Sequence, residues 1–161
     1  VISILTLVCI WVVMKNQDFF LTLATYPMRA KPYRALGGSA YLTWMEYNTL
    51  FDIIKYMPLR FVYFTFGPFP WHIKTVFQLL SAAEGFLILL AFFYTIVSLI
   101  KNKFGRNSSL KLYLFLFCII GLLISSTVDS NFGTSVRHRI LYVIFLFVFA
   151  ADYLYTKKTL K

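Results

Sequence analysis

Apolar stretches with almost no charge alternate with polar segments along the chain. The apolar stretches cover residues 1–14, 75–100, 112–128 and 140–156, and the only charges inside them are Glu84 and Asp152. An α-helix rises about 1.5 Å per residue, so crossing a hydrocarbon core of about 30 Å takes about 20 apolar residues. The pattern therefore predicts an all-α, polytopic helical membrane protein with about four transmembrane helices.

The first of these predicted spans is short. Residues 1–14 would cover only about 21 Å as a helix, and the sequence opens on Val1 rather than Met, inside the apolar run. We expect a truncated span and a chain that is the C-terminal part of a longer protein. A signal peptide is the competing interpretation, but the run lacks a basic segment before it and a small-residue cleavage site after it. The other spans are predicted at about residues 77–100, 112–128 and 140–156.

The composition also favours a membrane location. Hydrophobic residues make up 60% of the chain, charged residues make up 14%, and the mean hydropathy is +0.73. A soluble domain needs fewer apolar residues than this. The net charge of +10 would suggest nucleic acid as the partner of a soluble protein. In a membrane protein, topology, anionic membrane lipid and an anionic substrate explain it better, and we expect no nucleic-acid partner.

The cysteines and histidines do not form a metal-binding pattern. Cys9 and Cys118 lie inside apolar runs, whereas His72 and His138 lie at the predicted membrane surfaces. Neither a CxxC nor an HExxH spacing occurs. The cysteines are interpreted as small core residues, and we expect neither a metal nor a cofactor.

The distribution of basic residues predicts the orientation. Four lysines and arginines crowd residues 101–111, and the chain ends in a lysine-rich tail. Short basic connections remain in the cytoplasm under the positive-inside rule. We therefore predict a multi-pass protein of the plasma (inner) membrane with a cytoplasmic C-terminus. Residues 15–74 and the connection after Val128 then lie outside the cytoplasm.

The long extracytoplasmic segment, residues 15–74, is too polar to be a simple span. A polar stripe at i, i+4 and i+7 predicts an interfacial amphipathic helix from Tyr41 to Met57, which Pro58 should end or kink. The stretch GPFPW, residues 67–71, contains two prolines and a glycine. We expect a rigid turn there, with an exposed aromatic anchor at the membrane interface.

The most unusual polar stretch is NFGTSVRHR, residues 131–139, which we expect to be a loop between two spans. Arginine is disfavoured in short translocated loops, so Arg137 and Arg139 should have a function beyond topology. Arginine binds phosphate through a planar fork of donors, and Asp129 and His138 add a candidate base. The alternative is that Asp129 pairs with Arg137 or Arg139 and that nothing binds.

Two further features allow both a functional and a structural interpretation. Arg29 and Arg34 flank a proline in a basic cluster that would contact either lipid headgroups or a substrate. Glu84 lies in the first third of a predicted span, where an ionisable group should face protein or water. It would serve either as a proton or substrate contact or as the buried partner of Arg60 or Lys74.

The order of these motifs resembles the C-terminal half of a family of bacterial proteins. The motifs are PLR at residues 58–60, FGPFPW at residues 66–71, a span with an early glutamate, and NFGTSVRHR before a final span. They resemble those of O-antigen or capsule repeat-unit polymerases and related lipid-linked glycosyltransferases of surface-polysaccharide biosynthesis. The histidine motif typical of O-antigen ligases is not recognisable in residues 15–74, so the resemblance favours polymerase-like activity.

The resemblance implies a reaction and a set of roles. A sugar hydroxyl of an acceptor would attack a polyprenyl-pyrophosphate-linked glycan on the outer face of the membrane, without a nucleotide sugar. Arg137 and Arg139 would hold the pyrophosphate, and His138 or Asp129 would assist proton transfer. The residues implied to guide the glycan or a second phosphate are Arg29, Arg34 and Arg60. Membrane lipid and other polysaccharide-assembly proteins are the implied partners.

Two other classes of function compete with this one. A transporter or flippase for a lipid-linked saccharide would rely on Glu84 and Asp152 as ionisable groups within the membrane. A structural membrane subunit without catalysis would need neither carboxylate, nor the loop arginines, for chemistry. The sequence leaves all three classes open.

Overall fold

The computed structural model describes residues 38–101 and 108–159, together with isolated positions at residues 11, 15, 16, 18, 22, 25 and 26. Most of the first predicted span, residues 1–14, lies outside the described residues. So do the cluster containing Arg29 and Arg34, the connection at residues 102–107 and the last two residues of the chain.

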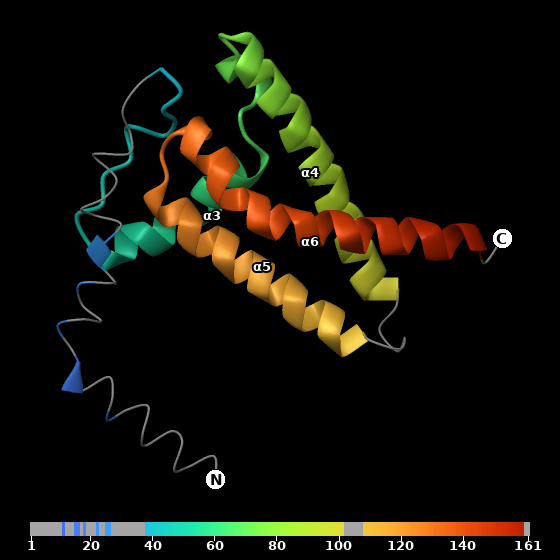
Figure 1. The fold of residues 1–161 in the computed structure, drawn as a ribbon. Helices are drawn as coiled ribbons and strands as arrows, with labels where there is room; N and C mark the ends of the chain where they lie inside the picture. The colour runs from blue at the N-terminus through green and yellow to red at the C-terminus, as the bar shows by residue number, and fades with distance from the viewer. Residues whose placement is uncertain are drawn as a thin grey trace.

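The described chain folds into long helices. In chain order these are α3 (Leu50–Phe66), the short 3₁₀-helix η1 (Pro70–His72), α4 (Val76–Lys101), α5 (Ser108–Val128) and α6 (Phe132–Thr159) (Figure 1). Within the described residues, three segments are long and apolar enough to cross a membrane: Val76–Lys101, Ser109–Val128 and Phe132–Tyr155. The predicted all-α, polytopic membrane fold is confirmed.

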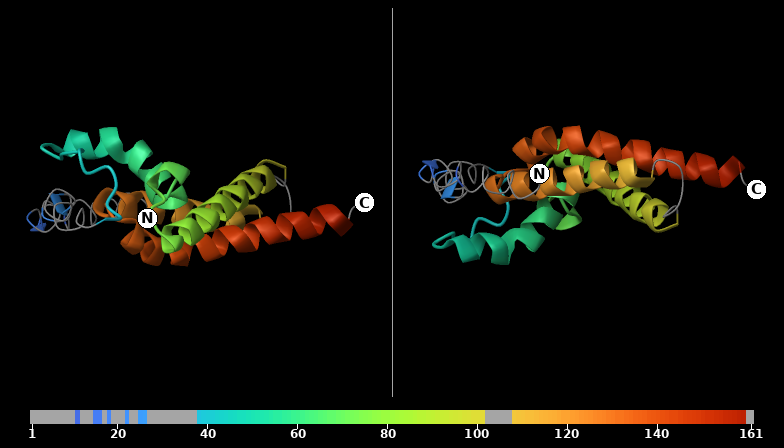
Figure 2. Two further views of the ribbon diagram at one scale, coloured as in Figure 1. Left: turned by 90° about the horizontal axis from the view of Figure 1, so that it is seen from above. Right: turned by 90° about the horizontal axis from the view of Figure 1, so that it is seen from below.

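Helix α6 is the centre of the bundle. It packs along both α4 and α5, whereas α4 and α5 contact each other little (Figures 1 and 2). The starts of α4 and α6 and the end of α5 lie together, and we call this the polar end of the bundle because the buried charges gather there. Helix α3 joins the bundle at this end and packs mainly against α5.

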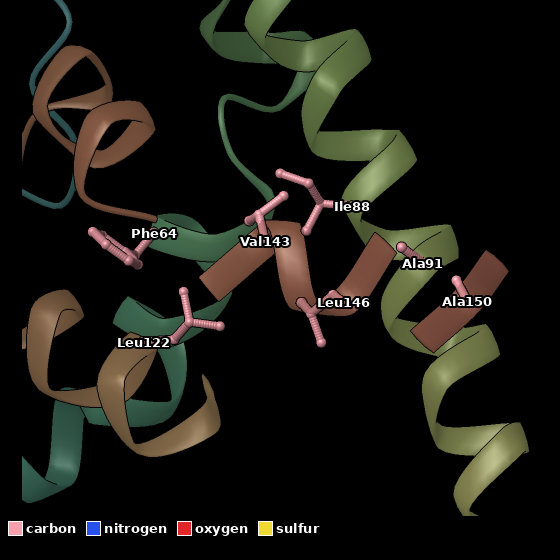
Figure 3. Packing of buried hydrophobic residues seen from close by; sticks show 7 residues of the cluster. All are labelled: Phe64, Ile88, Ala91, Leu122, Val143, Leu146 and Ala150. Atoms are coloured by element: carbon pink, nitrogen blue, oxygen red, sulfur yellow. The ribbon is translucent and has the colours of Figure 1, made fainter. Parts of the chain in front are cut away.

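A small apolar core holds the four helices together. Side chains from α3, α4, α5 and α6 meet in it: Phe64, Ile88, Ala91, Leu122, Val143, Leu146 and Ala150 (Figure 3). Large apolar side chains on the outer faces of the spans, such as Phe93, Ile124 and Ile144, are exposed. In water this surface would be unfavourable, but it suits helices whose outer faces contact lipid.

Two glycines allow helices to approach closely. A Cβ atom at Gly85 of α4 would lie 2.2 Å from the carbonyl oxygen of Phe66, at the end of α3. A Cβ atom at Gly121 of α5 would lie 2.2 Å from the ring of Tyr142 in α6. Small residues are common at such contacts in membrane proteins.

Helix α3 differs from the predicted helix at both ends. The prediction ran from Tyr41 to Met57, but α3 starts at Leu50 and continues through Pro58 to Phe66. Its start is set by a capping box, in which Thr49 and Asp52 each accept from the other's backbone N–H. A proline inside a helix removes one backbone hydrogen bond. The part of α3 after Pro58 packs against other helices, and these contacts compensate for the lost bond.

The stretch NFGTSVRHR is also helical, so the prediction of a loop is wrong. Helix α6 starts at Phe132, and only residues 129–131 separate it from α5. Asn131 starts the helix, because its side-chain oxygen accepts from the N–H of Gly133 at 2.9 Å and its carbonyl oxygen accepts from the N–H of Ser135 at 3.0 Å. Asparagine is a favoured N-cap residue, which accounts for the early start.

The GPFPW stretch forms a turn between α3 and α4, as the sequence suggests. The Gly67–Pro68 peptide bond is cis, and η1 follows directly. Trp71 is 70% exposed and stacks on Phe69, with ring centroids 5.0 Å apart.

Candidate functional site

Arg139 is fully buried at the polar end and bonds to the end of α3. Its Nη1 donates to the carbonyl oxygens of Phe64 at 3.2 Å, Thr65 at 3.0 Å and Gly67 at 2.7 Å. The last carbonyls of a helix have no partner within the helix, and a cation there also offsets the negative end of the helix dipole. Arg139 therefore caps α3 from the second turn of α6.

Arg60 makes a corresponding contact with the end of α5. It belongs to α3, and its Nε donates to the carbonyl oxygen of Ser126 at 2.7 Å, in the last turn of α5. Its Nη2 donates to the carbonyl oxygen of Asp129 and, at 3.0 Å, to Oγ of Ser130. Both arginines are thus surrounded by protein groups, and these contacts give each a structural role.

Glu84 of α4 approaches the guanidinium group of Arg139. One of its carboxylate oxygens lies 3.4 Å from Nη2 of Arg139. The buried partner expected for Glu84 was Arg60 or Lys74, and the structure places Arg139 there instead. Asp152, at the opposite end of the bundle, bonds to Lys111 of α5 and so links α5 to α6.

Asp129 and His138 form the closest pair of titratable groups at the polar end. Oδ2 of Asp129 lies 2.5 Å from Nδ1 of His138. The carboxylate side chain is only 1% exposed, whereas the imidazole is 46% exposed. The non-binding alternative paired Asp129 with Arg137 or Arg139, whereas in the structure its carboxylate bonds to His138 and orients an imidazole that faces the surroundings.

The helical conformation separates the three residues of the RHR sequence. Successive residues of an α-helix point about 100° apart, so Arg137, His138 and Arg139 lie on different sides of α6. Arg139 is buried, and the other two are exposed. Only Arg137 and His138 are thus in a position to meet a ligand together.

Tyr41 holds the short connection between α5 and α6. Its hydroxyl donates to the carbonyl oxygen of Asp129 at 3.0 Å and lies 3.0 Å from Oγ of Ser135. Its N–H donates to the carbonyl oxygen of Ser130 at 2.9 Å, and its ring stacks on Phe132 at a centroid distance of 4.5 Å. Burial raises the pKa of this phenol far above its usual value, so it stays a hydrogen-bond donor.

Sequence reasoning missed Tyr41 and its neighbour Tyr47. The hydroxyl of Tyr47 donates to the carbonyl oxygen of Thr127 at 3.2 Å, and its ring lies 5.5 Å from the guanidinium of Arg60. The groups that bond to the two hydroxyls lie 80 or more residues away in the sequence. Nothing in the local pattern indicates such pairings.

The described residues contain no group of three or more histidine, cysteine, aspartate or glutamate side chains that could hold a metal ion. The arrangement that they do contain is a carboxylate–imidazole pair, with the exposed Arg137 one residue before the imidazole in the chain. Such a pair can accept a proton from a bound hydroxyl group, because the carboxylate fixes the ring and stabilises the imidazolium that forms. Comparison with family models, curated protein sequences and solved structures gave no match to the chain.

Proposed function

We propose that the protein is a polymerase or transferase acting on a lipid-pyrophosphate-linked oligosaccharide at the outer face of the plasma membrane. The observation that carries the proposal is the Asp129–His138 pair, in which a buried carboxylate holds a half-exposed imidazole at one end of three membrane-spanning helices. The motif resemblance supplies the substrate class. Two lysines at the opposite end, Lys101 of α4 and Lys111 of α5, support an outer location for the polar end.

The proposed reaction uses His138 as a general base. Asp129 occupies Nδ1, so Nε2 accepts the proton of the acceptor sugar hydroxyl. The hydroxyl oxygen forms a bond to the anomeric carbon of the donor glycan, and the bond from that carbon to the pyrophosphate oxygen breaks. The lipid pyrophosphate leaves with the bonding electrons, and the proton on His138 passes to it or to water.

Arg137 is the proposed contact for the pyrophosphate. It is exposed and adjacent in sequence to His138, and its guanidinium can bind two phosphate oxygens at once. Arg139 and Arg60 are left out of the binding surface, because their guanidinium groups are buried and bonded to backbone carbonyls. Arg29 and Arg34 remain predicted contacts for the glycan.

A transporter of a lipid-linked saccharide is the second candidate. The observation that favours it is the Glu84–Arg139 pair, because Glu84 lies within a span and its side chain is still 37% exposed. A partly exposed carboxylate at this depth is typical of residues that move protons or ligands.

The proposed polymerase is tested by replacing His138→Gln in the full-length protein within its own cells. The expected result is loss of long surface polysaccharide and accumulation of lipid-linked single repeat units, at an unchanged amount of protein in the membrane. His72→Gln is the matched control, since His72 is the only other histidine in the sequence. Normal polymer length in the His138 variant would refute the reaction proposed here. Glu84→Gln, with transport as the readout, tests the second candidate.

A further inference from the structure

A cavity of about 480 Å³ lies at the polar end, between the starts of α4 and α6. Its lining residues come from four parts of the chain: Gly38, Ser39, Pro68, Lys74, Thr75, Phe77, Gln78, Ser81, Phe132 and Gly133. The volume falls within the range of about 300–1,000 Å³ that small-molecule sites occupy. Neither Asp129 nor His138 lines it, so the cavity is separate from the pair that carries the proposed function.

The cavity and His138 lie on opposite sides of α6. Gly133 lines the cavity, and His138 follows five residues later. At about 100° per residue, five residues turn the helix by about 500°, which places the two positions about 140° apart. A ligand in this cavity would therefore approach α6 from the side facing α4.

The charge of the cavity favours an anion. Among the described residues that line it, Lys74 carries the only charge, and none is acidic. Hydroxyl groups of Ser39, Thr75 and Ser81 belong to the same lining. The positive ends of two helix dipoles, those of α4 and α6, also meet there.

Two of the backbone amides near the start of α4 already have hydrogen-bond partners. The N–H of Lys74 donates to Oε1 of Gln78 at 2.7 Å, and the N–H of Gln78 donates to Oγ1 of Thr75 at 3.3 Å. The Ser39 hydroxyl likewise donates to Oδ1 of Asn131 at 2.8 Å. An incoming anion would therefore bind mainly through the ammonium group of Lys74 and the hydroxyls of Thr75 and Ser81. This combination of a lysine with hydroxyl donors suits a phosphate group.

Apolar side chains at the start of α4, one of which lines the cavity, are exposed. Phe77 lines the cavity and is 82% exposed, and its neighbours Val76 and Leu80 on α4 are exposed as well. All three belong to a segment long and apolar enough to span a membrane. A ligand whose phosphate lies beside Lys74 would thus have its apolar part next to lipid-facing side chains.

We propose that this cavity is a binding site for the phosphate group of a membrane amphiphile with a net negative charge, with Lys74 as the principal anion contact. The tail of the amphiphile lies along the exposed side chains at the start of α4. This site does not depend on the proposed function, because an ordinary anionic phospholipid meets the same requirements as a lipid-linked glycan. Lys74 was one of the expected partners of Glu84, but Glu84 pairs with Arg139. Binding of an anion would give Lys74 a role.

The test uses the full-length protein purified in a non-ionic detergent, with the midpoint of thermal unfolding as the readout of binding. Dihexanoylphosphatidate should raise the midpoint in a saturable manner, whereas zwitterionic dihexanoylphosphatidylcholine should not. Inorganic phosphate should bind more weakly because it lacks the apolar part. Phosphate as effective as phosphatidate would overturn the assignment to an amphiphile.

Variants locate the binding. Lys74→Gln should weaken binding of dihexanoylphosphatidate about tenfold or more, whereas Lys74→Arg should retain it. Lys101→Gln is the matched control, because Lys101 is exposed at the other end of the same helix. Ser81→Leu should weaken binding by filling the cavity without changing the charge. Equal binding by the Lys74→Gln and Lys101→Gln variants, or unchanged binding by Ser81→Leu, would refute the site.

Discussion

Nη1 of Arg139 lies 2.7 Å from the carbonyl oxygen of Gly67, 72 residues earlier in the chain. This bond joins the second turn of α6 to the residue that ends α3. Arg60 of α3 makes the equivalent bond to the end of α5. The two arginines that looked like ligands for an anion thus hold helix ends together.

Arg139→Met should destabilise the protein strongly. The substitution removes three hydrogen bonds to backbone carbonyls and leaves Glu84 without its cation. We expect a loss of about 3 kcal/mol or more in the free energy of unfolding, measured by thermal or denaturant unfolding in detergent. Arg137→Met is the control, since Arg137 is exposed two residues away on the same helix, and it should change stability by about 0.5 kcal/mol at most. Equal losses would contradict the structural role of Arg139.

Gly85→Ala should also be destabilising. The added Cβ would lie 2.2 Å from the backbone oxygen of Phe66, which cannot move without shifting the end of α3. Overpacking of this kind costs about 1–3 kcal/mol. Gly38→Ala provides the comparison, because a Cβ there meets nothing within 4 Å. The contact between α3 and α4 would be in doubt if the two variants unfolded at the same temperature.

Asp52 should make α3 sensitive to acid. The backbone N–H and hydroxyl of Thr49 hold the pKa of this carboxyl below its usual value. A lowered pKa in the folded state means that the cap stabilises above the unfolded pKa, near 3.9, and is lost as the pH falls through the folded value. The unfolding midpoint should therefore fall as the pH drops below about 5, first through the unfolded pKa and then through the lower folded pKa, and Asp52→Asn should reduce the part of the drop that comes from α3. An identical pH dependence in both proteins would argue against the cap.

Asp129→Asn tests the carboxylate as a positioning residue. In the proposed reaction it should lower the rate of polymer formation at saturating substrate by about 100-fold or more, because the imidazole loses its orienting partner. The substrate concentration at half-maximal rate should stay nearly constant, since Asp129 is buried and would not touch the glycan. A rise in that concentration with an unchanged maximal rate would instead assign Asp129 to substrate binding.

The proposed orientation can be tested by cysteine labelling in intact cells. Cys9 and Cys118 would first be replaced by alanine, and then Trp71→Cys or Lys101→Cys introduced at exposed positions at the two ends of the bundle. A membrane-impermeant maleimide should label the Trp71→Cys variant directly and the Lys101→Cys variant only after the cells are permeabilised. The reverse pattern would place the polar end in the cytoplasm.

The sequence predicts the membrane helices well because the length of an apolar run is a local property. The runs predicted at residues 77–100, 112–128 and 140–156 each fall within one described helix. Helix ends were harder to predict, because single hydrogen bonds from Thr49 and Asn131 determine where α3 and α6 begin. A continuous helix through Pro58 depends on contacts with other helices, which the local pattern does not contain.

The sequence indicates which residues belong to the candidate site but not which of them contact one another. His138 and Asp129 were selected as a candidate base, and the structure brings their side chains together. Arg137 and Arg139 point to different sides of α6 because the segment is helical. The predicted loop gave no reason to expect this. The backbone carbonyls that accept from Arg139 and Arg60 lie 66 to 75 residues away, so sequence spacing could not predict these bonds.

The bonds of Arg60 and Arg139 also affect the position of His138. At the polar end, α3 is bonded to α5 and to α6, and its last residue lies against Gly85 of α4. The four long helices are therefore joined at the end of the bundle where Asp129 and His138 lie. A substitution that removes either guanidinium group should thus also disturb the position of the imidazole.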